Sequence, residues 1–179
     1  ELTIVVNLAH AARFGNELEE RFVNLLGVVA HEVFHAAFGA YKDRSSLWKA
    51  HHRTHKRPFD RLLDLTQNEG IAYYLSIDQL GGGQLPRDWS IKIRDVFSTF
   101  NKSSLELLSA GLKSKRAAEL LRAANLSGFW ESYGAITGMF IAREIDLRLG
   151  RAALIETITL GPYDFFQKYL SLSIQNGNL

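Results

Sequence analysis

The spacing of apolar positions predicts an opening strand followed by a long helix. Residues 2–8, LTIVVNL, are β-branched and apolar and are bounded by polar residues, which is typical of a strand. After them, apolar residues recur at the three- and four-residue intervals of a helix with one buried face. The positions on this face are Leu18, Phe22, Leu25, Leu26, Val29 and Val33. The helix is expected to begin at Asn16, with Glu19 as its capping-box partner, and to end near Gly39.

The rest of the chain repeats the helical pattern between glycine and proline breaks. We expect a loop and a short helix over residues 41–57, then a helix that begins at Pro58 and ends at the GGG of residues 81–83. The later helices are expected at 87–100, 103–124, 130–149, 151–160 and 163–171. The pattern therefore predicts an α+β fold that is predominantly helical. One strand is not stable alone, so a longer natural chain is expected to supply the rest of a sheet.

Composition limits the chemistry that the chain can support. With 179 residues and 46% apolar content, residues 1–179 are expected to form a single domain with a sizeable core. There are no cysteines, so a metal can be held only by His, Asp or Glu. The net charge of +2 does not indicate a nucleic-acid or membrane partner, and no run of 18 apolar residues predicts a membrane span. Because the chain begins with Glu1, we expect a processed or trimmed product of a longer protein.

Three ionisable side chains interrupt an apolar stretch, VVAHEVFHAAF, at residues 28–38. Burying such groups costs several kcal/mol unless something compensates them. His31 and His35 are four residues apart, so a helix places both imidazoles on one face within reach of a single ion. Glu32 lies about 100° round the helix, where it can contact a metal-bound water. We expect one Zn²⁺ per chain here; the alternative is two helical histidines satisfied by local hydrogen bonds.

A catalytic zinc site needs a third protein ligand and one open position for water. The segment TQNEGIAYYLS, residues 66–76, offers Glu69 within an apolar helix. Gly70 follows it and lets another backbone or a substrate approach closely. Glu69 is therefore the candidate third ligand, and the alternative is an exposed helical carboxylate.

The combination of HEVFH with NEGIAYY resembles the gluzincins, the thermolysin-like zinc peptidases. It is more closely similar to an uncharacterised bacterial family classed as zinc-dependent peptidases. The resemblance implies that His31, His35 and Glu69 hold Zn²⁺ and that Glu32 acts as general base and acid in peptide hydrolysis. It also implies a thermolysin-like core whose edge strand binds a peptide or protein substrate, and it favours export from the cell. The connection between His35 and Glu69 is longer than is usual in the gluzincins, so we expect an inserted helix over the site.

The resemblance further implies a donor for the oxyanion that forms during hydrolysis. The candidate is Tyr133, in SYGAITGMF, because its interval from Glu69 is similar to that in related families. Tyr73, one turn after Glu69, is the competing candidate, and a structural role for Tyr133 is the third possibility. The candidates for orienting the histidine ligands are Asn68, Asp64 and Asp60.

A second histidine group lies in a basic segment. It consists of His51, His52 and His55 among Lys49, Arg53, Lys56 and Arg57. The surrounding positive charge favours a solvated face over a second metal site. Nucleic-acid binding is a weaker alternative, and a basic lid that favours acidic substrates is a third.

Two other functions remain open for the whole chain: a non-catalytic zinc-containing scaffold, and a metal-dependent hydrolase of a non-peptide substrate. Glu32 argues against the scaffold, because a structural zinc site does not need a carboxylate that activates water. Substrate preference, the choice between endo- and exopeptidase action and the oligomeric state do not follow from the sequence.

Overall fold

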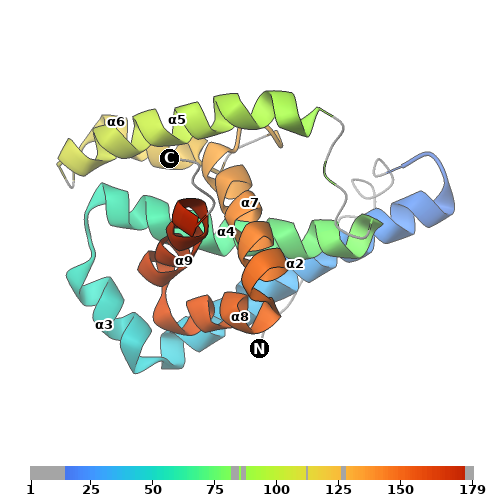
Figure 1. Ribbon diagram of the computed structural model, residues 1–179, viewed down its shortest axis with the longest axis horizontal. Helices are drawn as coiled ribbons and strands as arrows, with labels where there is room; N and C mark the ends of the chain where they lie inside the picture. The colour runs from blue at the N-terminus through green and yellow to red at the C-terminus, as the bar shows by residue number, and fades with distance from the viewer. Residues whose placement is uncertain (1–14, 82–84, 86–87, 112, 126–127, 176–179) are drawn as a thin grey trace.

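The computed structural model describes residues 15–81, 85, 88–111, 113–125 and 128–175, and these residues form helices joined by short connections (Figure 1). The helices are α2 (Leu18–Arg44), α3 (Ser46–Thr54), α4 (Pro58–Gly81), α5 (Trp89–Ser109), α6 (Lys115–Ala123), α7 (Tyr133–Leu149), α8 (Arg151–Leu160) and α9 (Pro162–Gln175).

The predicted α+β fold is wrong, because the described part of the chain is all-α and contains no strand. The thermolysin-like core with an edge strand is therefore not observed. The strand predicted at residues 2–8 lies outside the described residues. The apolar residues of the described chain recur at helical intervals, so they bury their surface by packing helix against helix.

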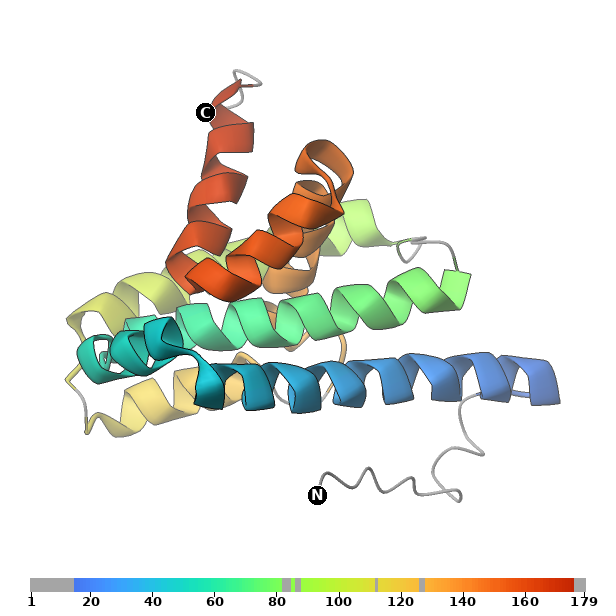
Figure 2. The same cartoon turned by 90° about the horizontal axis from the view of Figure 1, so that it is seen from below.

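The central element is α4, which packs against α2 on one side and against α7 on the other. Figure 2 shows α2 and α4 side by side along most of their length. The core closes around α4 and α7, with further side chains from α5 and α9. Its fully buried members include Leu62, Ile71, Leu107, Ile136, Met139, Ile141, Ile145 and Phe165.

The backbones of α4 and α7 touch at Gly70 and Gly138. A Cβ atom built on Gly70 would overlap the backbone of Gly138, and one built on Gly138 would overlap the carbonyl oxygen of Thr66. Only glycine permits so close a crossing of two helices. The prediction that Gly70 admits another backbone is thus confirmed, and the crossing fixes the segment of α4 that carries Glu69.

Several helix ends differ from the prediction. Gly39 does not end α2: a side chain at this position would meet nothing within 4 Å, and the helix continues to Arg44. The helix predicted over residues 103–124 is divided, since α5 runs to Ser109 and Ser114 caps α6 by accepting the Ala117 amide.

Other helix ends follow the prediction or shift by one position. Pro58 begins α4 and Gly81 ends it, as predicted, and α8 has the expected bounds. At the start of α2, it is Glu20 rather than Glu19 that reaches back, accepting the amide of Asn16 at 2.9 Å.

The face of α2 that was expected to be buried is largely exposed. Leu18 and Phe22 are 81% and 59% exposed, and Leu26 and Val33 are also exposed. Among the described helices, α2 packs mainly on α4, with a smaller contact to α3, so one side of it stays uncovered. By length and composition, α2 is also long and apolar enough to cross a membrane. Core helices of soluble proteins and signal sequences have the same property. The expectation that no segment crosses a membrane stays a prediction.

The short helix α3 is held down by a buried tryptophan. Trp48 is 1% exposed, packs edge-on against Phe38 of α2, and donates its indole N–H to the carbonyl of Ile158 at 2.8 Å. The connection between α2 and α4 thus contains an ordered helix, α3, which packs on α2 and α8.

Candidate metal centre

Two antiparallel helices bring His31, His35 and Glu69 together. Their ligand atoms all lie within 4.8 Å of one another. The two histidine Nε2 atoms are 2.9 Å apart, and Oε2 of Glu69 lies 3.3 Å from Nε2 of His35 and 3.6 Å from Nε2 of His31. Tetrahedral zinc with bonds of about 2.0–2.1 Å separates its ligand atoms by about 3.3–3.4 Å. The donor set therefore fits a zinc ion in its chemistry, and its distances of 2.9 Å, 3.3 Å and 3.6 Å lie within about half an ångström of tetrahedral spacing.

Local geometry explains why these three residues meet. His31 and His35 occupy successive turns on the face of α2 that packs on α4. The connection from His35 to Glu69 comprises the end of α2, the helix α3 and the start of α4, and so returns the chain in the opposite direction. Lys42 and Asp64 join the two helices by an ion pair with an N–O distance of 2.5 Å, which fixes their register beyond the cluster.

The cluster is partly buried and carries coupled charges. The side chains of His31, His35 and Glu69 are 17%, 22% and 15% exposed. Burial would raise the pKa of Glu69, but hydrogen bonds and charge from the two histidines lower that pKa to about 2. Burial would lower the pKa of His35, yet Glu69 outweighs it and the pKa is raised. Glu69 is therefore a carboxylate at neutral pH, which is the form that binds a metal.

Asn68 orients one of the histidines. Its Oδ1 lies 3.3 Å from Nδ1 of His35 and so accepts a hydrogen bond from Nδ1 in the tautomer that leaves Nε2 to bind a metal. The two other candidates have different partners: Asp64 pairs with Lys42, and Asp60 accepts the hydroxyl of Tyr163 at 2.7 Å. Of the three candidates, only Asn68 contacts a histidine of the cluster.

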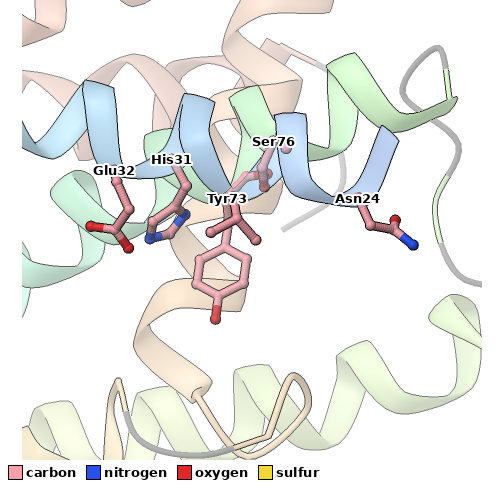
Figure 3. Close-up of a pocket in the computed structure, with 7 residues that line it drawn as sticks. Asn24, His31, Glu32, Tyr73 and Ser76 are labelled. Atoms are coloured by element: carbon pink, nitrogen blue, oxygen red, sulfur yellow. The ribbon is translucent and has the colours of Figure 1, made fainter. Parts of the chain in front are cut away.

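Glu32 lines an open hollow beside the cluster. The hollow has a volume of about 410 Å³ and is lined by Asn24, Gly27, Val28, His31, Glu32, Tyr73 and Ser76. Figure 3 shows Glu32 and Tyr73 on either side of His31, with all three side chains directed toward the same side of the helices. Glu32 is exposed, so its carboxylate is accessible to water and to a ligand in this hollow.

The two candidate tyrosines have different surroundings. The ring of Tyr73 lies edge-on to His31, with centroids 4.9 Å apart, and burial together with the charge of Glu69 raises its pKa. Tyr133 is 3% exposed and donates its hydroxyl to the carbonyl of Leu120 at 2.7 Å. The structure thus brings Tyr73 to the cluster and places Tyr133 in the helical core.

A second hollow, of about 310 Å³, opens on the other side of the cluster. It is lined by Arg61, Asp64, Leu65, Asn68, Glu69 and Leu121. The cluster of His31, His35 and Glu69 therefore lies between two hollows along the α2–α4 pair.

The second histidine group does not assemble a comparable cluster in the described part of the chain. His51 and His55 stack with ring centroids 4.3 Å apart, and His52 lies 3.5 Å from Asp64. Burial and the neighbouring His55 lower the pKa of His51. These contacts favour imidazoles that pack on one another and on Trp48 over a metal site.

Four residues of the first hollow were not identified from the sequence: Asn24, Gly27, Val28 and Ser76. Gly27 and Asn24 precede His31 by four and seven residues, so they share its helical face. Continuing the three- and four-residue spacing of a helical face from His31 towards the start of α2 predicts the positions of Gly27 and Asn24.

Comparison with known proteins gives one family match. The family model described as "Putative zinc dependent peptidase (DUF5700)" matches residues 2–177, a range that contains every described helix. Neither the curated proteins nor the solved structures contain a match to the chain.

Proposed function

The chain belongs to the DUF5700 family of putative zinc-dependent peptidases, and on that premise we propose that it is a zinc metallopeptidase of the gluzincin type. The observation that carries the proposal is the convergence of His31, His35 and Glu69 at zinc-ligand spacing, with Glu32 exposed beside them in an open hollow. Two histidines from one helix and a glutamate from a second form the gluzincin ligand set. In the described part of the chain, a pair of helices carries the three candidate ligands.

Each residue of the site has a role in this reaction. His31, His35 and Glu69 would hold Zn²⁺, which when bound makes water acidic enough to act as a nucleophile at neutral pH and polarises a substrate carbonyl. The carboxylate of Glu32 takes a proton from the attacking water and delivers it to the leaving amine. Asn68 keeps the Nδ1 proton of His35 in place and so leaves Nε2 free to bind the ion.

Tyr73 is the better candidate for the oxyanion donor. Its ring contacts His31 and it lines the same hollow as Glu32. A tyrosine hydroxyl is protonated at neutral pH, as a hydrogen-bond donor must be, and burial and the charge of Glu69 raise the pKa of Tyr73 further. Tyr133 would first have to give up its hydrogen bond to the carbonyl of Leu120. We therefore assign this role to Tyr73 in preference to Tyr133.

Metal content and peptide cleavage, measured on the same preparations, test the proposal. Mass spectrometry should find about one zinc per wild-type chain and much less in Glu69→Ala. Glu32→Gln should keep its zinc and lose cleavage of a fluorogenic peptide library, because the ligands remain and the proton acceptor is gone. Glu119→Ala, at a side chain that is 68% exposed on α6, is the matched control and should behave as wild type. A wild-type protein that takes up no zinc would refute the proposal, as would full activity in Glu32→Gln.

A pair of tyrosine variants tests the assignment of the oxyanion donor. Tyr73→Phe keeps the ring against His31 but removes the hydroxyl, so kcat should fall about 100- to 1000-fold with zinc content unchanged. Tyr133→Phe should leave kcat near the wild-type value and lower stability by about 1–3 kcal/mol, because the buried carbonyl of Leu120 loses its donor. The opposite pattern of kcat values would return the role to Tyr133.

A further inference from the structure

The second hollow continues the line of the metal cluster along α4. Arg61, Leu65, Glu69 and Tyr73 are four residues apart in sequence, so they form one stripe on the surface of the helix. Tyr73 borders the first hollow, Glu69 lies at the cluster, and Leu65 and Arg61 border the second hollow. A peptide lying along this stripe would pass the metal cluster and enter the second hollow.

The charge of the second hollow is set by Arg61. The carboxylate of Asp64 is already paired with Lys42 at 2.5 Å and lies 3.5 Å from His52. Glu69 is a ligand of the cluster, so its charge is offset when zinc is bound. The side chain of Arg61 is exposed, and within the described part of the chain its guanidinium forms no ion pair or hydrogen bond. The group available for a ligand in this hollow is therefore a cation.

The first hollow differs from the second in the charge of the residues that line it. Its ionisable residues are Glu32 and the cluster histidine His31, together with Tyr73, and no lysine or arginine is among the described residues that line it. Among the described residues that line the two hollows, Arg61 is thus the only lysine or arginine.

The distance from the cluster to Arg61 matches a short stretch of peptide. Arg61 precedes Glu69 by eight residues of α4, which corresponds to about 12 Å along the helix axis. An extended peptide advances about 3.3 Å per residue, so three to four residues span this distance. A guanidinium binds a carboxylate through two parallel hydrogen bonds, which makes it selective for that group.

We propose that the second hollow is a substrate subsite in which Arg61 binds a peptide carboxylate three to four residues from the scissile bond. The inference rests on the proposed peptidase function and adds a substrate class to it. The carboxylate belongs either to an aspartate or glutamate side chain or to the carboxyl terminus of the substrate. Both sources present the same planar anion to Arg61, and the experiment distinguishes them.

The test uses short fluorescein-labelled peptide hydroxamates and the zinc-loaded full chain. The hydroxamate chelates zinc and so fixes the register of the peptide, and it is placed at the amino end in one set and at the carboxyl end in another. Each set carries Glu or Gln three residues from the chelating group. Peptides of the amino-end set also have a free or an amidated carboxyl terminus. Fluorescence anisotropy gives the Kd of each peptide without any need for cleavage.

In one of the two sets, the peptide with a carboxylate should bind at least about tenfold tighter than its fully amidated Gln counterpart. Arg61→Gln should abolish this preference, while the affinity for the uncharged peptide and the zinc content stay at the wild-type level. Arg94→Gln is the matched control, because Arg94 is also an exposed helical arginine but lies on α5 and lines neither hollow. It should keep the full preference.

The outcomes separate this subsite from the proposed function. Equal binding of charged and uncharged peptides in both sets, or a preference that survives Arg61→Gln, overturns the subsite even if peptides are cleaved. A preference that depends on Arg61 in a protein that binds zinc but cleaves no peptide supports carboxylate binding by Arg61, refutes the peptidase, and overturns the assignment of this hollow to a substrate. A chain that takes up no zinc overturns both proposals.

Discussion

Replacing Gly138 by alanine tests whether the crossing of α4 and α7 holds the metal centre in place. The new methyl group would overlap the carbonyl oxygen of Thr66 and lie 2.9 Å from Cα of Gly70, whereas ordinary contacts begin near 3.4 Å. Both neighbours are backbone atoms, so no side-chain rotation relieves the clash and the helices must separate. Overpacking of this kind costs about 1–3 kcal/mol, and the unyielding backbone places this case at the upper end. The higher helix propensity of alanine offsets this loss of stability by up to about 1 kcal/mol.

The expected net loss for Gly138→Ala is therefore about 2 kcal/mol, or a fall in Tm of about 4–8 °C for a chain of this length. Thermal unfolding of the metal-free protein measures it, and a zinc titration should show weaker binding because Gly70 is adjacent to Glu69. Gly39→Ala is the matched control: it makes the same change within a helix, but nothing lies within 4 Å of the added methyl group. It should raise Tm slightly. If both variants unfold at the same temperature, the close crossing is not present in solution.

Three further predictions concern the surroundings of the site. Asn68→Ala removes the acceptor at Nδ1 of His35, so zinc affinity in a competitive chelator titration should fall about 10- to 100-fold. Despite the opposing effects of burial, ion pairing lowers the pKa of Glu69 from 4.5 to about 2 and raises that of His35 from 6.5. The stability that ionised Glu69 adds to the folded state is lost as pH falls below 4.5, and the stability that protonated His35 adds is lost as pH rises above 6.5. Urea midpoints of the metal-free protein should therefore be highest between these pH values. Trp48→Phe leaves the carbonyl of Ile158 without its indole donor and should lower the free energy of unfolding by about 1–3 kcal/mol with zinc content unchanged.

The parts of the site that could be predicted are those that local helix geometry determines. The spacing of His31 and His35 fixes their relative position on any α-helix, so the sequence alone places them together. The close approach at Gly70 was also predictable, because glycine between apolar residues of a helix indicates a contact that a side chain would prevent. Which backbone makes that contact was not predictable, since Gly138 belongs to α7, and two other helices separate α7 from α4 along the chain.

The parts that could not be predicted depend on packing between distant segments. The choice of Tyr133 relied on its interval from Glu69 in related families, and an interval does not reveal that Leu120 accepts its hydroxyl. The α+β prediction had a similar weakness, because it extended one β-branched segment to a sheet for which the sequence offered no further strand. Tyr73 was accessible to sequence reasoning, since it follows Glu69 by one helical turn.

A pair of antiparallel helices is sufficient to bring the three candidate ligands together, provided that its register is fixed. The contacts of Tyr73 with His31 and of Asp64 with Lys42 fix that register on either side of Glu69. A slip of α4 by one residue would move Glu69 about 1.5 Å along the axis and turn it by about 100°, away from both histidines. The ligand geometry is therefore a consequence of side-chain contacts between α2 and α4 that exist before any metal binds. Because the helices already hold the three candidate ligands close together, we expect that a metal would not need to fold the site, in contrast to small domains that fold only around their metal.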